Sequence, residues 1–184
     1  MADAHRTGLD RAGLAVCLLA GVAVATTLGV VGAQQGQPRL LPVWWFTSMQ
    51  SMKAWLSSAV LLMIVAQVLT ASWMYGRLPL VRRAPAWVGP IHRVNGVLAF
   101  LLSLPVAYYC VYAFGFDTLT PRTTLHSVAG CVFYGAFASK MIGLRMARLP
   151  GWLIPVLGGT LFTAFVVAWY LSSWWWFQLV GYGR

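Results

Sequence analysis

Acidic residues are almost absent from this sequence. Its 184 residues include no glutamate and three aspartates, and charged residues of both signs make up 9% of the chain. A soluble domain ordinarily carries roughly 25% charged residues. The three aspartates, Asp3, Asp10 and Asp117, fall outside the hydrophobic segments. Without a carboxylate in those segments, paired-carboxylate catalysis is excluded and a proton-coupled carrier is disfavoured.

Other signals of known chemistry are also missing. The three cysteines, Cys17, Cys110 and Cys131, form no CxxC pair, so neither a disulfide framework nor a zinc site is indicated. All three fall in hydrophobic segments, which favours buried apolar thiols. No phosphate-binding loop and no GxSxG nucleophile motif occurs, so the sequence does not support an intramembrane protease.

Long hydrophobic segments dominate what is present. The chain is 60% hydrophobic, with a mean hydropathy of +0.73. Runs of 18 or more apolar residues with few charges are typical of membrane-spanning helices. The expected spans cover residues 13–33, 52–75, 91–114, 123–144 and 152–177. The sequence therefore predicts an all-α, polytopic membrane bundle of about five transmembrane helices, organised as one integral membrane domain over residues 1–184.

The net charge of +10 reflects membrane topology rather than nucleic-acid binding, because the basic residues lie between the hydrophobic segments. Lys140, in the last turns of the fourth segment, is expected to extend its ammonium to the cytoplasmic side. Eight arginines fall on one predicted side of the bilayer: Arg6, Arg11, Arg77, Arg82, Arg83, Arg93, Arg145 and Arg148. Four basic residues fall on the other: Arg39, Lys53, Arg122 and Arg184. This asymmetry predicts a cytoplasmic N-terminus and an outside C-terminus. The excess of arginine over lysine and the abundance of alanine, glycine and valine suggest a bacterial source, so the expected location is the bacterial cell membrane.

Two histidines share one local pattern. His92 opens the third segment and His126 opens the fourth, and both begin an H-x-V-x-G sequence that ends at Gly96 and Gly130. Each glycine lies one helical turn from its histidine, on the same face. An imidazole near a helix end can bind haem iron, and a glycine one turn deeper leaves room for the macrocycle. The alternative is structural: such a histidine bonds a carbonyl or water, and the glycine serves helix packing.

Consecutive spans run antiparallel, so His92 and His126 lie near opposite faces of the membrane and cannot bind the same iron. A second histidine for His126 would have to stand near the outer end of the third segment, and the residues expected at that depth are Tyr108 and Tyr109, whose side chains can also bind haem iron. We expect these tyrosines, Cys110 and His126 to cluster there. If no haem is bound, a tyrosine hydroxyl is the expected partner of His126.

Methionine thioethers are the other candidate ligands. Met49 and Met52 are expected near the level of His126. Met74, Met141 and Met146 are expected near the level of His92. Methionine is more often a gap filler than an iron ligand.

Several segments between Lys53 and Phe177 carry a resemblance to a known family. They are Lys53–Leu56, Tyr75–Leu78, His92–Gly96, Leu104–Tyr108 and His126–Phe137. On these segments the chain resembles an uncharacterised family of actinobacterial multi-span membrane proteins, which look like haem b proteins of the cytochrome b and ferric-reductase type. The resemblance implies an association with Rieske iron–sulfur proteins. It also implies a histidine where Tyr109 stands, completing a pair with His126, and this chain departs there.

Together these patterns lead to a membrane electron-transfer subunit with, or derived from, a b-type haem site as the expected function. The expected cofactor-binding residues are His126, His92, Gly130, Gly96 and Tyr109, with His126 and His92 as the iron ligands. The expected partners are the lipid bilayer and a Rieske-type or other redox protein, and no nucleic acid. A non-catalytic scaffold or assembly subunit of a membrane complex is the alternative function. A small-solute carrier or channel is the third.

Overall fold

The computed structural model describes residues 2–35, 39–78, 83–146 and 149–180, with side chains from residue 11 onward. Arg82, Arg148, Arg184 and the side chain of Arg6, which were counted in the predicted charge asymmetry, lie outside this description. The helices are α1 (Ala2–Ala33), α2 (Met49–Met74), α3 (Val88–Tyr109), α4 (Pro121–Gly143), α5 (Leu153–Trp169) and α6 (Trp175–Val180). Two π-helical turns, η1 (Cys110–Phe114) and η2 (Tyr170–Trp174), continue α3 and α5.

The predicted all-α membrane bundle is confirmed. Each expected span corresponds to a helix whose ends lie close to the predicted ones, apart from the earlier start of α1, and the described residues contain no strand. Among the described residues, four helical segments are long and apolar enough to cross a membrane: Arg11–Ala33, Met49–Met74, Val88–Phe114 and Leu153–Val180. The exception, α4, is less apolar because it carries Arg122, His126 and Lys140 along with several serines and threonines.

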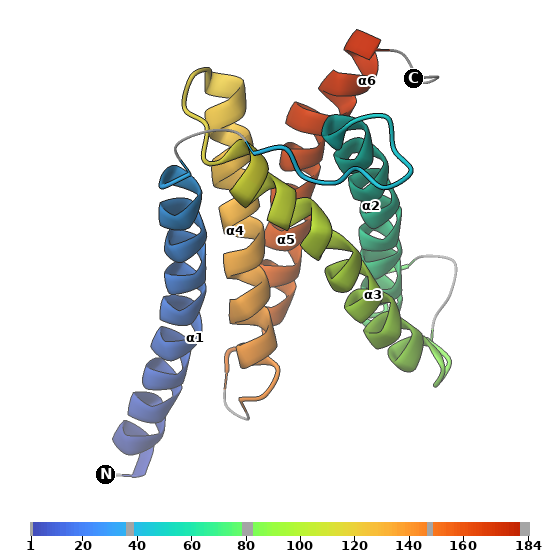
Figure 1. The fold of residues 1–184 in the computed structure, drawn as a ribbon. Helices are drawn as coiled ribbons and strands as arrows, with labels where there is room; N and C mark the ends of the chain where they lie inside the picture. Colours follow the sequence, from blue (N-terminus) through green and yellow to red (C-terminus); the bar gives the residue numbers. More distant parts are fainter. Residues whose placement is uncertain (1, 36–38, 79–82, 147–148, 181–184) are drawn as a thin grey trace.

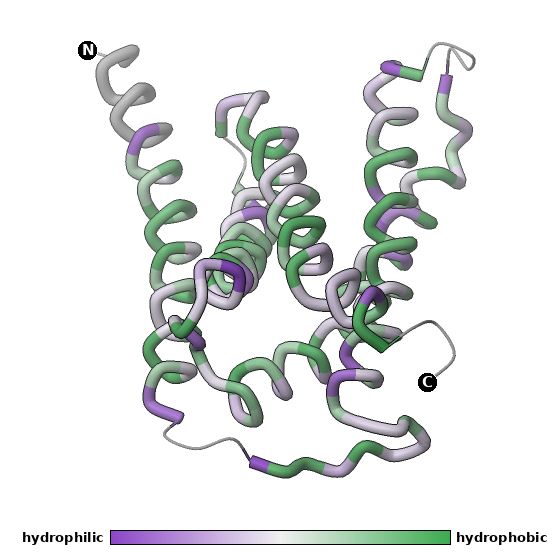
Figure 2. The backbone as a smooth tube through the Cα atoms, turned by 90° about the horizontal axis from the view of Figure 1, so that it is seen from above, coloured by the Kyte–Doolittle hydropathy of each residue, from purple (hydrophilic) through white to green (hydrophobic). Residues whose placement is uncertain are grey.

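The helices pack as two groups that meet along α5. Helix α4 lies between α1 and α5, while α2 and α3 form an antiparallel pair that contacts this layer mainly through α2 and α5. Figure 1 shows α1, α4 and α5 side by side, with α3 crossing obliquely toward α2, and Figure 2 shows the same separation from above. At one end of the bundle, α2 and α4 begin and α1 and η1 end. We call this end the cavity end. The opposite end carries the α2–α3 and α4–α5 connections.

Helices α1 and α4 approach closely through small residues. A side-chain carbon added to Gly135 would lie 2.6 Å from the carbonyl oxygen of Gly21. One turn away, the Cys17 thiol donates to the Ser139 carbonyl at 2.9 Å, and the Ser139 hydroxyl donates to the Cys17 carbonyl at 3.0 Å. Such small-residue contacts are the usual basis of helix association in lipid. The predicted burial of Cys17 is confirmed, because its side chain is 0% exposed.

Candidate functional site

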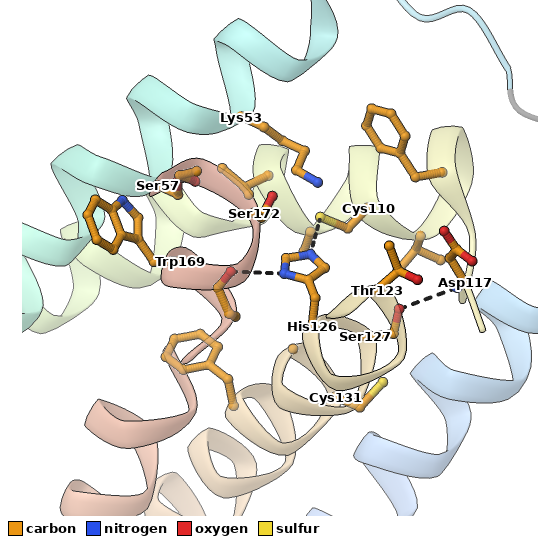
Figure 3. A pocket seen from close by; sticks show the side chains of 18 of the residues that line it. Lys53, Ser57, Cys110, Asp117, Thr123, His126, Ser127, Cys131, Trp169 and Ser172 are labelled. Carbon is orange, nitrogen blue, oxygen red and sulfur yellow. Dashed lines mark hydrogen bonds between the residues drawn. The ribbon is translucent and has the colours of Figure 1, made fainter. Parts of the chain in front are cut away.

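A cavity of about 330 Å³ lies inside the bundle at the cavity end, and all five long helices contribute to its wall. A single water needs only roughly 10–15 Å³ of such space, whereas ligand sites span roughly 300–1,000 Å³. The wall is mostly apolar, and several polar side chains enter it (Figure 3). These include Lys53, Cys110, Asp117, Thr123, His126 and Ser172. The cavity therefore has the size and lining of a binding site.

His126 is held rigidly at this cavity. Helix α4 begins at Pro121 behind a capping box, in which the Thr120 hydroxyl accepts from the Thr123 backbone N–H. This fixed start places His126 less than two turns into the helix. The imidazole Nδ1 lies 2.9 Å from the carbonyl oxygen of Ala168 on α5. A carbonyl can only accept, so in the neutral imidazole Nδ1 carries the proton and Nε2 keeps its lone pair.

Cys110 is the partner of that lone pair. Cys110 is the first residue of η1, and its Sγ lies 3.9 Å from Nε2 of His126 (Figure 3). The ammonium of Lys53, on α2, lies beside the same sulfur and 4.6 Å from the centre of the Phe114 ring. Among the described residues, no carboxylate forms an ion pair with Lys53. The cavity thus brings together an imidazole, a thiol and an ammonium.

Two helices change to π geometry where they face the cavity. Cys110 and Phe114 line it from η1, and Ser172 and Ser173 line it from η2. Single π turns are rare and occur often at functional sites. A π turn bonds five residues back instead of four, so it displaces nearby carbonyls from the α pattern. Next to and within η2, carbonyls accept from side chains of α4: Ala168 from His126, and Leu171 from Arg122 at 2.6 Å.

Hydrogen bonds to α2 fix η2 in place. The hydroxyls of Ser57 and Ser173 lie 2.7 Å apart, and both are buried. The Trp169 indole N–H donates to the Ser58 hydroxyl at 2.9 Å. These bonds connect the α2–α3 pair to α5 at the depth of the cavity. The wall behind His126 is consequently a fixed surface.

The two H-x-V-x-G sequences lie in different surroundings. A carbon added to Gly130 meets no atom within 4 Å, because Gly130 borders the cavity below His126. A carbon added to Gly96 would lie 3.2 Å from Oε1 of Gln67, whose amide also donates to the His92 carbonyl at 2.6 Å. Nδ1 of His92 lies 2.8 Å from the Thr70 hydroxyl. Gly96 accommodates a side chain of α2, whereas Gly130 borders open space.

The predicted contact between a tyrosine and His126 is wrong. The Tyr109 hydroxyl donates to the Pro42 carbonyl, and its ring is buried against Met52 and Ala113. Both ring nitrogens of His126 have other partners. On α3, successive residues point in directions about 100° apart. When Cys110 faces the cavity, its neighbour Tyr109 faces the segment before α2 instead. Of the predicted cluster, the structure brings Cys110 and His126 together.

The predicted methionine ligands lie away from the cavity wall. Met52 is 0% exposed and packs in the cluster with Tyr109, and Met49 contacts the same cluster. Met146 packs against the cluster around Cys17 near the opposite end. The residues that the sequence interpretation missed are Cys110 as a partner of His126, and Lys53. Cys110 follows Tyr109 in the chain, so the level on α3 at which His126 finds its partner was predicted correctly. The residue that faces His126 at that level was not.

A haem fits the residues at this cavity. His126 and Cys110 place one nitrogen and one sulfur donor at the cavity, and haem iron is held by one or two protein ligands of these kinds. Nε2 of His126, which contacts the Cys110 thiol, is the ring nitrogen not bonded to Ala168 and is the candidate ligand, and the open space at Gly130 suits a flat macrocycle. Arg122 lines the same cavity and can pair with a carboxylate of a haem.

These features define a helical membrane protein with a histidine-lined cavity near one end of its bundle. The chain belongs to a family of unknown function, DUF6529, whose model matches residues 14–183. This membership agrees with the resemblance to an uncharacterised family. No curated protein and no solved structure matches the chain.

Proposed function

We propose that this protein is an electron-transfer subunit of the bacterial cell membrane whose cavity would hold a b-type haem, with His126 as the residue that would bind the iron. The single observation that carries the proposal is the bond from Nδ1 of His126 to the Ala168 carbonyl. Metal-binding histidines almost always donate their other ring N–H to a carbonyl or carboxylate, which fixes the tautomer and the ring orientation. His126 has this arrangement, and its Nε2 faces the cavity.

The residues around the cavity support one-electron transfer better than substrate turnover. The described cavity wall holds one carboxylate, Asp117, which accepts from the Leu119 N–H at 2.7 Å. A bound haem would supply a one-electron couple, and the chain itself would supply orientation and a mostly apolar setting. The proposed redox partner is a Rieske-type or other iron–sulfur protein. In the proposed orientation the cavity end faces outside, so that partner would dock there.

The proposal is tested by the absorption spectrum of protein purified from cells with ample haem. We expect a haem absorbance near roughly 410–430 nm, which arises from the cofactor's own chemistry. His126→Ala should abolish it. His92→Ala is the matched control and should retain it, because His92 lies near the opposite end and is bonded to Thr70. Native protein without this absorbance, under the same haem supply, contradicts the proposal.

A non-catalytic scaffold subunit is the second candidate, favoured by a separate observation. Both ring nitrogens of His126 already have protein partners, Ala168 and Cys110, and the imidazole connects α4 with α5 and η1. In that case His126→Ala should cost about 1–3 kcal/mol of stability, because it strands the partly buried Cys110 thiol and Ala168 carbonyl. The two candidates differ in the spectrum of the native protein.

A further inference from the structure

Cys110 occupies the position from which a second axial ligand would reach the same iron. It comes from η1, which lies across the cavity from α4, and its Sγ is 3.9 Å from Nε2 of His126. First-row metal ions bind sulfur at about 2.3 Å and imidazole nitrogen at about 2.0 Å. Two ligands on opposite sides of one ion are therefore separated by about 4.3 Å. The observed separation of Sγ and Nε2 is within a few tenths of an ångström of that value.

The charges at the cavity favour sulfur ligation by Cys110. Iron is bound by a thiolate rather than by a thiol, and a neighbouring cation stabilises the thiolate. The ammonium of Lys53 lies beside the Cys110 sulfur (Figure 3). The cost of a charge in an apolar setting is reduced when it is paired.

The other donors near this level are less suitable. The Tyr109 hydroxyl is bonded to the Pro42 carbonyl, and Met52 is buried against Tyr109. Cys131 also lines the cavity, but it lies five residues beyond His126 on the same helix, and its Sγ lies toward α1, 3.8 Å from a carbon added to Gly29. Among the cavity-lining side chains of the described residues, Cys110 is the one that forms a hydrogen bond with Nε2.

We propose that Cys110 is the second axial ligand of the haem, so that the iron is held between the Cys110 thiolate and the His126 imidazole. This inference rests on the proposed function. It replaces the tyrosine expected from the sequence with the next residue along the chain, and it assigns Lys53 the role of stabilising the thiolate. A six-coordinate, low-spin ferric haem follows from it.

The test compares Cys110→Ala with Cys131→Ala, because both thiols line the cavity and only one contacts His126. The purified proteins are measured by ferric absorption and electron paramagnetic resonance spectra. We expect a low-spin signal with thiolate character in native protein and in Cys131→Ala. Cys110→Ala should keep its haem through His126 and become high-spin. Cys110→His should restore a low-spin haem whose spectrum is that of two imidazoles.

Thiol labelling gives a second readout that does not depend on the spectrum. In variants that keep one cysteine, bound haem should slow labelling of Cys110 by N-ethylmaleimide at least tenfold, and labelling of Cys131 much less. A haem absorbance with an unchanged low-spin spectrum in monodisperse Cys110→Ala overturns the assignment of Cys110 and leaves the proposed function intact. Native protein with no haem absorbance overturns both, so the two failures are distinguishable.

Discussion

His126 and His92 begin the same five-residue pattern near the starts of consecutive helices, and the structure gives them different roles. At the cavity end, the ring of His126 is fixed by Ala168 and its Nε2 faces a cavity bordered by Gly130. Near the opposite end, the ring of His92 is bonded to Thr70, and Gln67 fills the space next to Gly96. A short motif therefore specifies which face of a helix carries a small residue and a polar side chain. The neighbouring helix determines whether the space becomes a site or a packing contact.

The largest expected effect is on a topology reporter, because it depends on which end of the helix bundle faces the outside of the cell. The proposed orientation places the cavity end outside and the α2–α3 connection in the cytoplasm, from the distribution of arginine and lysine. A reporter that is active only in the cytoplasm should be silent when fused after Arg184. The same reporter inserted after Leu78 should be active. Activity after Arg184 would mean that the number of spans or the orientation is different.

The glycines of the two motifs should respond oppositely to enlargement. Gly96→Leu is expected to destabilise the protein by about 1–3 kcal/mol, because the new side chain overlaps Gln67 in a packed contact. Gly130→Leu should change the free energy of unfolding by less than about 0.5 kcal/mol, because its side chain enters open space. Thermal unfolding in detergent measures both. In the haem-loaded protein, Gly130→Leu should in addition weaken the absorbance. Equal destabilisation by the two variants would contradict the comparison.

The smallest effect is expected at the lysine near the opposite end. Lys140 lies half-buried in the last turn of α4, close enough to the helix end to reach the interface. Lys140→Met should change stability by less than about 0.5 kcal/mol and leave expression unchanged. Lys53→Met, its counterpart at the cavity, should lower haem retention several-fold, and Lys53→Arg should restore most of it. A loss of expression in Lys140→Met would show that Lys140 has a specific partner inside the bundle.

Much of the fold could be predicted from the sequence. The hydrophobic segments gave the helices, and their ends matched because prolines, glycines and the Thr120 cap interrupt them locally. Part of the site was also predictable, since His126 and Gly130 fall on one face of one helix. The prediction of a tyrosine on α3 as the partner of His126 was wrong. The sequence gives the depth of Tyr109 and Cys110, but a change of one residue rotates the side chain by about 100°.

The sequence by itself determined a bundle of membrane helices, the small face of each H-x-V-x-G motif and the depth at which His126 lies. These depend on local properties: hydrophobic length, helical periodicity and capping. Only the tertiary structure decided that the cavity forms at His126 and not at His92, and that Cys110 faces it. The reason is that these outcomes depend on neighbours far away in the sequence. Helix α5 supplies the Ala168 carbonyl, η1 turns Cys110 toward the imidazole, and Gln67 of α2 occupies the corresponding space near the opposite end.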